Sequence, residues 1–156
     1  MSQLPKPDRE QLRAKYPEIF DRPAASRLAT VYTADDTPLT YTLRGGGGAD
    51  TLAGGTGIDT ADFSTSAAGV TVNLAVGTAS GGDAQGDTLS GIENLIGSAN
   101  ADSLTGDDNA NLIAGTAGSD TLIGGLGNDT YIADGDDTIT EAASAGTDLV
   151  QASGSV

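Results

Sequence analysis

The sequence predicts an all-β fold built from short coils that stack on one another. A nine-residue period runs through the later part of the chain, and almost every copy has a glycine-rich turn followed by one apolar residue. The copies GSANADSLT, GDDNANLIA, GTAGSDTLI and GGLGNDTYI follow one another over residues 97–132, and GGGGADTLA and GGTGIDTAD occupy residues 45–62. A fixed short period of this kind is typical of a solenoid.

Each position of the repeat predicts one part of a coil. Positions 1, 2 and 4 favour Gly, position 6 is Asp or Asn, and position 8 is apolar. The glycines permit positive φ and close backbone approach, so the first six residues are expected to form a tight turn. The last three residues predict a minimal strand with one inward side chain. In the contiguous copies these inward side chains are Leu104, Ile113, Leu122 and Tyr131.

The charge distribution divides the chain at Arg44. All seven basic residues and all five prolines lie in residues 1–44, whereas all 23 glycines lie after Arg44. The remaining segment carries sixteen acidic residues and no basic residue. We therefore predict two parts: residues 1–44 form an N-terminal cap or a fragment of a preceding domain, and residues 45–156 form the repeat region.

The composition also excludes several functions. A surface this acidic cannot bind nucleic acid through its phosphates, and its expected partner is a cation. The chain has neither Cys nor His, which excludes disulfides, zinc sites built on those residues, and Ser-His-Asp or Cys-His catalysis. No apolar run has the length of a transmembrane helix, and residues 1–20 lack the apolar core of a cleaved signal peptide. A disordered acidic linker has a similar composition but does not hold a nine-residue phase.

The pattern G-G-x-G-x-D-x-apolar-x resembles the nonapeptide of the repeats-in-toxin (RTX), or haemolysin-type calcium-binding, family. The resemblance covers about residues 45–150, and copies 45–53 and 124–132 satisfy every defined position, whereas copy 54–62 has only Ala61 in the apolar place. It implies a parallel β-roll in which two nonapeptides make one coil. It also implies several Ca²⁺ ions between successive turns on the same edge, held by position-6 side chains and turn carbonyl oxygens.

Two residues on the same edge of such a roll are eighteen positions apart, so Asp102 is expected to face Asp120, and Asn111 to face Asp129. Calcium takes six to eight oxygen ligands from carboxylates and backbone carbonyls. The predicted side-chain ligands are Asp50, Asp59, Asp87, Asp102, Asn111, Asp120, Asp129 and Asp137. The predicted carbonyl ligands lie in the turns at Gly46, Gly48, Gly55, Gly57, Gly118, Gly125 and Gly127.

The pair Asn111 and Asp129 carries only one negative charge. Its calcium site is therefore expected to be weaker than that of Asp102 and Asp120, unless Asp107 or Asp108 assists. The apolar core of the repeats is too small to order the chain alone, and the acidic charges repel one another. We therefore expect calcium ligation to supply folding free energy.

The repeat register breaks in three places. An insert at residues 63–81 contains the alternating segment 70–74, which predicts a strand with one apolar face. A degenerate copy, GDAQGDTLS, is then followed by the hexapeptide GIENLI (91–96), which we expect to place Leu95 inward and to lie below Asp102. Beyond residue 132 the phase slips by one residue, leaving the partial copies GDDTIT and GTDLV. We expect these irregular copies to serve packing more than calcium binding.

The head of the chain predicts a small helix and hairpin cap. Asp8 and Gln11 resemble a capping box at the start of a short helix, and residues 27–33 and 38–44 predict two strands around a turn. The open end of a solenoid needs a polar cover, which favours a cap over the end of a cadherin-like repeat, to which residues 35–41 bear a weak likeness.

The resemblance implies a calcium-binding module of a secreted or surface bacterial protein that folds on calcium outside the cell. Such proteins leave through type I secretion machinery, directed by an uncleaved C-terminal signal. The alternatives are a structural or adhesive spacer of a larger surface protein, or an accessory module of a secreted hydrolase whose catalytic domain is not in this chain. The chain itself is not expected to be an enzyme, to bind nucleic acid or to insert into a membrane.

Overall fold

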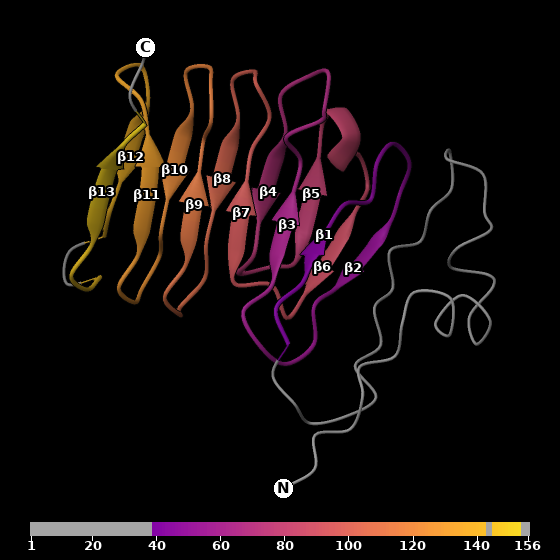
Figure 1. Ribbon diagram of the computed structural model, residues 1–156, viewed down its shortest axis with the longest axis horizontal. Coiled ribbons are helices and arrows are strands. Elements are labelled where there is room, and N and C mark those ends of the chain that lie inside the picture. The colour runs from indigo at the N-terminus through magenta and orange to yellow at the C-terminus, as the bar shows by residue number, and fades with distance from the viewer. Residues whose placement is uncertain (1–38, 143–144, 154–156) are drawn as a thin grey trace, which may run out of the picture.

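The computed structural model describes residues 39–142 and 145–153, which form two sheets that face each other along the long axis of the molecule (Figure 1). The six-stranded sheet contains, in spatial order, β1 (Thr42–Leu43), β3 (Thr60–Asp62), β7 (Asn94–Ile96), β9 (Leu112–Ala114), β11 (Thr130–Ala133) and β13 (Leu149–Ala152). The seven-stranded sheet contains β12 (Thr138–Thr140), β10 (Thr121–Ile123), β8 (Ser103–Thr105), β4 (Thr71–Asn73), β5 (Thr78–Ser80), β6 (Thr88–Ser90) and β2 (Thr51–Ala53).

The chain passes from one sheet to the other at almost every turn, so that successive strands of a sheet belong to successive coils. The pairs β8–β10, β9–β11 and β7–β9 are all parallel. Two three-residue strands and two turns therefore make one coil, as the nine-residue period requires. The predicted parallel β-roll is confirmed.

The position-8 side chains form one apolar ladder in each sheet. Leu122 pairs with Leu104 in one sheet, and Tyr131 pairs with Ile113 in the other, and all four are fully buried. Most strands have one such inward side chain, whereas β11 buries both Tyr131 and Ala133 and β13 buries none. The core is continuous because the coils stack in register.

The insert adds two strands to one sheet only. The predicted apolar-faced strand is β4, which pairs in parallel with β8 and antiparallel with β5, and β5 pairs antiparallel with β6. Strand β5 and the short 3-10 helix η1 (Gly82–Ala84) were not predicted. The insert separates β6 from β8, whereas β7 and β9 stay adjacent in the opposite sheet. The regular succession of turns is therefore broken along one edge of the roll.

The roll begins before Gly45. Strand β1 comes from the predicted strand at residues 38–44, but its partner is β3 of the next coil, in parallel. The predicted helix and the predicted strand 27–33 lie outside the described residues, so the proposed cap and the division at Arg44 stay predictions. Among the residues that the structure describes, no helix is long and apolar enough to span a membrane.

Candidate metal centre

The residues that precede ten of the thirteen described strands form two rows along the edges of the roll. The first row precedes strands β2, β6, β8, β10 and β12 of the seven-stranded sheet and consists of Asp50, Asp87, Asp102, Asp120 and Asp137. The second row precedes strands β3, β7, β9, β11 and β13 of the six-stranded sheet and consists of Asp59, Glu93, Asn111, Asp129 and Asp148.

Row residues of successive coils are joined by one repeated hydrogen bond. The backbone N–H of Asp102 donates to Asp120 Oδ1 at 2.8 Å, and that of Asn111 donates to Asp129 Oδ1 at 2.8 Å. The same bond joins Asp50 to Asp87, Asp59 to Glu93, Asp120 to Asp137 and Asp129 to Asp148. The expected facing of residues eighteen positions apart is therefore present, while calcium binding by these residues remains a prediction.

Two features of the rows differ from the expectation. Asp102 Oδ1 accepts the N–H of Val70 at 2.7 Å, so the insert lies below Asp102 and the hexapeptide does not. The hexapeptide belongs to the second row, where Glu93 Oε2 accepts the N–H of Asp59 at 2.8 Å. Sequence reasoning missed Glu93 as a site residue. Its signal was the spacing, because Glu93 stands two residues before the buried Leu95, as position 6 stands before position 8.

Several carboxylates leave their second oxygen without a partner. Among the described residues, these buried, unpartnered Oδ2 atoms belong to Asp50, Asp59, Asp87, Asp120 and Asp129. A buried polar atom without a hydrogen bond costs about 1–3 kcal/mol, and more when it is charged, so native proteins keep few of them. Five such atoms at equivalent positions indicate a missing partner that the described residues do not supply.

Four of these aspartates lie in turns whose position-2 residue has a positive φ. These position-2 residues are Gly46 (78°), Gly55 (97°), Thr116 (80°) and Gly125 (109°). We call the four turns, residues 45–50, 54–59, 115–120 and 124–129, the open turns. Thr116 is the only one of the four that is not glycine, and a β-branched residue adopts a positive φ only under constraint. Its hydroxyl donates to the carbonyl oxygen of Ser98, which holds it there.

Two other turns bond their own position-6 side chain. The N–H of Ser98 donates to Asp102 Oδ2 at 2.6 Å, and the N–H of Asp107 donates to Asn111 Oδ1 at 2.8 Å. In each turn the position-2 side chain also accepts the N–H of the Asn at position 4, as Ser and Asp side chains do in local turns. We call these turns, residues 97–102 and 106–111, the closed turns.

The glycine at position 1 is required because the turn wraps tightly around the carboxylate. A Cβ atom added to Gly115 would lie 2.3 Å from Asp120 Oδ2, and one added to Gly124 would lie 2.1 Å from Asp129 Oδ2. No side chain tolerates such distances. The seven glycines predicted to offer carbonyl ligands all have positive φ. Ligation by their carbonyl oxygens stays a prediction.

Burial and like charges make these carboxylates hard to ionise in the absence of a cation. Burial raises the pKa of Asp120 to about 6, and the charges of Asp137 and Asp102 add to the effect. Burial also raises the pKa of Asp87 to about 6, with a contribution from the charge of Asp50. Burial raises the pKa of Asp50, Glu93 and Asp129 in the same direction.

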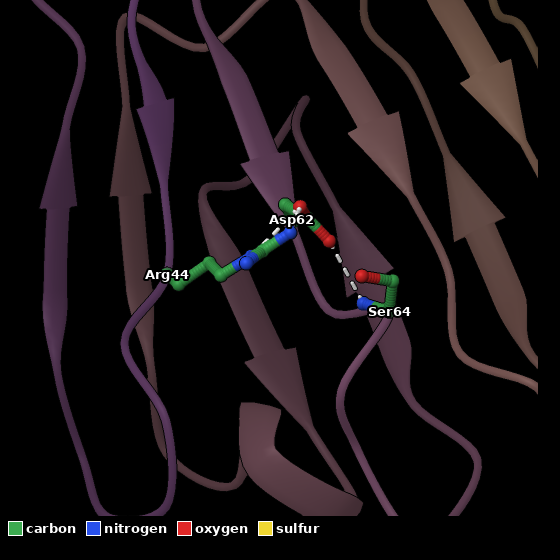
Figure 2. A network of polar contacts seen from close by, with 3 residues as sticks. All are labelled: Arg44, Asp62 and Ser64. Carbon is green, nitrogen blue, oxygen red and sulfur yellow. Dashed lines mark hydrogen bonds and ion pairs between the residues drawn. The ribbon is translucent and has the colours of Figure 1, made fainter.

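The described part of the chain offers little positive charge to offset this repulsion. Arg44 is the only basic residue in the described part of the chain, and it is paired with Asp62 outside the rows (Figure 2). Its Nε donates to Asp62 Oδ2 at 2.8 Å, and the N–H of Ser64 donates to Asp62 Oδ1 at 2.9 Å. Burial opposes ionisation of Asp62, but the hydrogen bonds from Ser64 and the charge of Arg44 outweigh it and lower the pKa.

The donor set fits a hard divalent cation. Its available atoms are carboxylate and carbonyl oxygens, and the chain has no Cys or His that would favour a softer metal. Four of the five unpartnered Oδ2 atoms lie in turns whose position-1 glycine leaves no room for a Cβ atom, so the tight turn around each of these carboxylates is part of the fold. Calcium, which accepts irregular oxygen shells, fits these turns better than magnesium, which demands a rigid octahedron.

Comparison with known families agrees with this chemistry. The RTX calcium-binding nonapeptide repeat, in a family description of 4 copies, matches residues 42–61, 87–116 and 105–139. No curated protein matches the chain. The matched residues include all four open turns and both closed turns, whereas the insert and the last turn, before β13, lie outside them.

Proposed function

Because the chain carries the RTX calcium-binding nonapeptide repeat, we propose that it is a calcium-binding β-roll module of a secreted or surface bacterial protein and that it folds as it binds calcium outside the cell. The observation that most strongly supports this proposal is the set of five buried aspartate oxygens without a partner. An ion in each turn would supply the missing contact and the missing positive charge.

In this proposal the two oxygens of a row carboxylate have separate tasks. In Asp120, Oδ1 accepts the N–H of Asp102 and fixes the stacking of one coil on the next. Oδ2 faces the turn, where it is free to bind a cation. A bound calcium ion would supply positive charge between carboxylates that otherwise repel one another. The ion would thereby favour the folded state over the unfolded one, in which the turns are not formed.

The proposal extends to compartment and partners. RTX repeats are typical of secreted proteins, and calcium at extracellular concentrations would complete the fold only after export. We infer export by type I secretion machinery from the same resemblance. The repeat is a calcium-binding module rather than a catalytic one, and we expect no catalysis from the chain as a whole.

A far-UV circular dichroism titration of the full chain tests the proposal. We expect calcium to increase β-structure with a midpoint below about 1 mM, the weak end of the range for extracellular calcium modules. Magnesium at the same concentrations serves as the control and should have a much smaller effect. A spectrum that does not change up to about 10 mM calcium would contradict the proposal, since that is ten times the weakest constant of such modules.

A further inference from the structure

Three carboxylates meet at the C-terminal end of the second row. One oxygen each from Asp129, Glu141 and Asp148 lies within 4.8 Å of the other two. Asp129 precedes β11, Glu141 directly follows β12, and Asp148 precedes β13, so the group joins three strands from both sheets. The RTX match ends at residue 139, so Glu141 and Asp148 lie outside the matched repeats.

A second observation distinguishes this group from an exposed acidic cluster. Asp129 is only 1% exposed, and its Oδ2 is one of the buried oxygens without a partner. A Cβ atom added to Gly124 would lie 2.1 Å from Asp129 Oδ2 and 2.2 Å from the Tyr131 hydroxyl, so these two oxygens are close neighbours. The Tyr131 hydroxyl donates to Glu141 Oε1. The unpartnered oxygen of Asp129 therefore faces the side on which Glu141 lies.

The spacing of the three carboxylates matches the needs of one calcium ion. Oxygen ligands at 2.3–2.6 Å from calcium lie no more than about 5 Å apart, and all three oxygens meet that limit. The three carboxylates carry like charges and repel one another at this separation. No basic residue follows Arg44 in the sequence, and Arg44 is paired with Asp62, so the described residues supply no cationic side chain to the group.

We propose that Asp129, Glu141 and Asp148 bind a calcium ion that fastens the last coil of the roll. The proposal rests on the proposed function, but it assigns a site in which one ligand, Glu141, comes from the segment after a strand instead of from a position-6 turn. The last coil is held by backbone hydrogen bonds between β11 and β13 rather than by an apolar ladder. Leu149 and Val150 of β13 are 52% and 56% exposed, so apolar burial contributes little there.

The decisive variant is Glu141→Gln, which keeps an oxygen acceptor for the Tyr131 hydroxyl but removes the charge. Equilibrium dialysis of the full chain should show that E141Q binds one calcium ion fewer than the parent at a calcium concentration that fills the parent. Asp136→Asn is the matched control, since Asp136 is exposed and its loss removes the same charge from a nearby turn. D136N should bind as many ions as the parent.

Hydrogen exchange locates the effect and separates the two proposals. In the parent, calcium should protect the amides of β13 and β10, and in E141Q only the protection of β13 should be lost. Equal ion numbers and equal β13 protection in E141Q and the parent would overturn the C-terminal site while leaving the proposed function intact. A parent chain that binds no calcium would refute both. Loss of β10 protection in E141Q would also overturn the site, because the residue would then act on the whole fold.

Discussion

Two adjacent repeats form the same turn in different ways. In the closed turn 106–111, Asn111 Oδ1 accepts the N–H of Asp107, and its Nδ2 donates to the carbonyl oxygen of Glu93 at 2.8 Å. In the open turn 115–120, the equivalent Asp120 leaves Oδ2 buried and unpartnered, with a pKa raised to about 6 by burial. The closed turn is complete without a metal, whereas the open turn is not.

The difference begins at positions 2 and 4 of the repeat. Closed turns have Ser or Asp at position 2 and Asn at position 4, and these residues bond one another and the position-6 side chain. Open turns have Gly at position 4 and a positive φ at position 2. The coil at residues 97–114 therefore has two closed turns, whereas the coils at residues 45–62 and 115–132 each have two open turns, whose carboxylate oxygens are left unpartnered. We expect the dependence of the fold on calcium to be set by local turn chemistry as well as by the number of aspartates.

The largest effect is expected from comparing Asp120→Ala with Asn111→Ala. Loss of a group that only supports a metal ligand costs about 10–100-fold in metal affinity, so loss of the ligand Asp120 should weaken calcium binding at least that much. N111A should change calcium affinity less. It should instead lower the free energy of unfolding by about 1–3 kcal/mol, because it leaves buried partners unsatisfied.

Calorimetric calcium titration together with urea unfolding measures both quantities. The comparison of open and closed turns would fail if N111A weakened calcium binding as much as D120A does.

Acidification should stabilise the calcium-free fold. The folded-state pKa of Asp87 and Asp120 is about 6, above the ordinary value of 3.8, so the folded state binds protons more tightly than the unfolded state. The resulting penalty is absent below about pH 3.8, develops as the pH rises through 6, and is fully present above it. We expect the melting temperature in a chelator to rise from pH 7 to pH 5, and calcium affinity to fall over the same interval.

Asp120→Asn serves as the control for the pH effect, since it removes one of the two titrating groups. If the melting temperature of the calcium-free protein fell from pH 7 to pH 5, the prediction that protonation of these carboxylates stabilises the fold would be contradicted.

Glycine at position 2 should have different consequences in the two kinds of turn. Ser98→Gly removes the hydroxyl that donates to Asp102 Oδ1 and accepts the N–H of Asn100, and should cost about 1–2 kcal/mol. Thr116→Gly also loses a hydrogen bond but relieves a left-handed β-branched residue, which costs about 1–3 kcal/mol. Chemical denaturation should therefore show a smaller loss for T116G than for S98G. Equal losses would mean that Thr116 is not strained.

The smallest effect is expected at the ion pair outside the rows. Arg44→Ala removes a half-exposed guanidinium from the buried Asp62, which keeps the N–H of Ser64, so the loss should be about 1 kcal/mol, the upper end of the range for exposed pairs. Because this pair lies outside both rows, the loss in thermal stability should be the same with and without calcium. A loss that appears only with calcium would place Arg44 in the metal-dependent part of the fold.

The period predicted the fold because the same side chain points inward once in every nine residues, as Leu104, Ile113, Leu122 and Tyr131 do. The same nine-residue period predicted the row residues at position 6 of the regular repeats. Glu93 was not predicted as a site residue because the hexapeptide is shorter than a repeat. Glu141 was not predicted because it occupies no position of the repeat. The order of β4 and β5 could not be predicted, since it depends on which sheet admits the insert. The distinction between open and closed turns depends on φ, which the Gly and Asn residues only suggest.

The most direct test of the account is to convert an open turn into a closed one. Thr116→Ser with Gly118→Asn gives residues 115–120 the position-2 and position-4 residues of the closed turn 97–102. The reciprocal variant, Ser98→Gly with Asn100→Gly, opens the closed turn and provides the control. The turn 115–120 must also rearrange at Gly118, where φ is 120° and a Cβ atom would lie 2.7 Å from the carbonyl carbon of Asn100. Equilibrium dialysis should show fewer bound calcium ions in the T116S/G118N chain than in the parent, and circular dichroism should show that the variant keeps the parent's β-structure in calcium. An unchanged number of bound ions in that chain would contradict the claim that turn chemistry decides where calcium is needed.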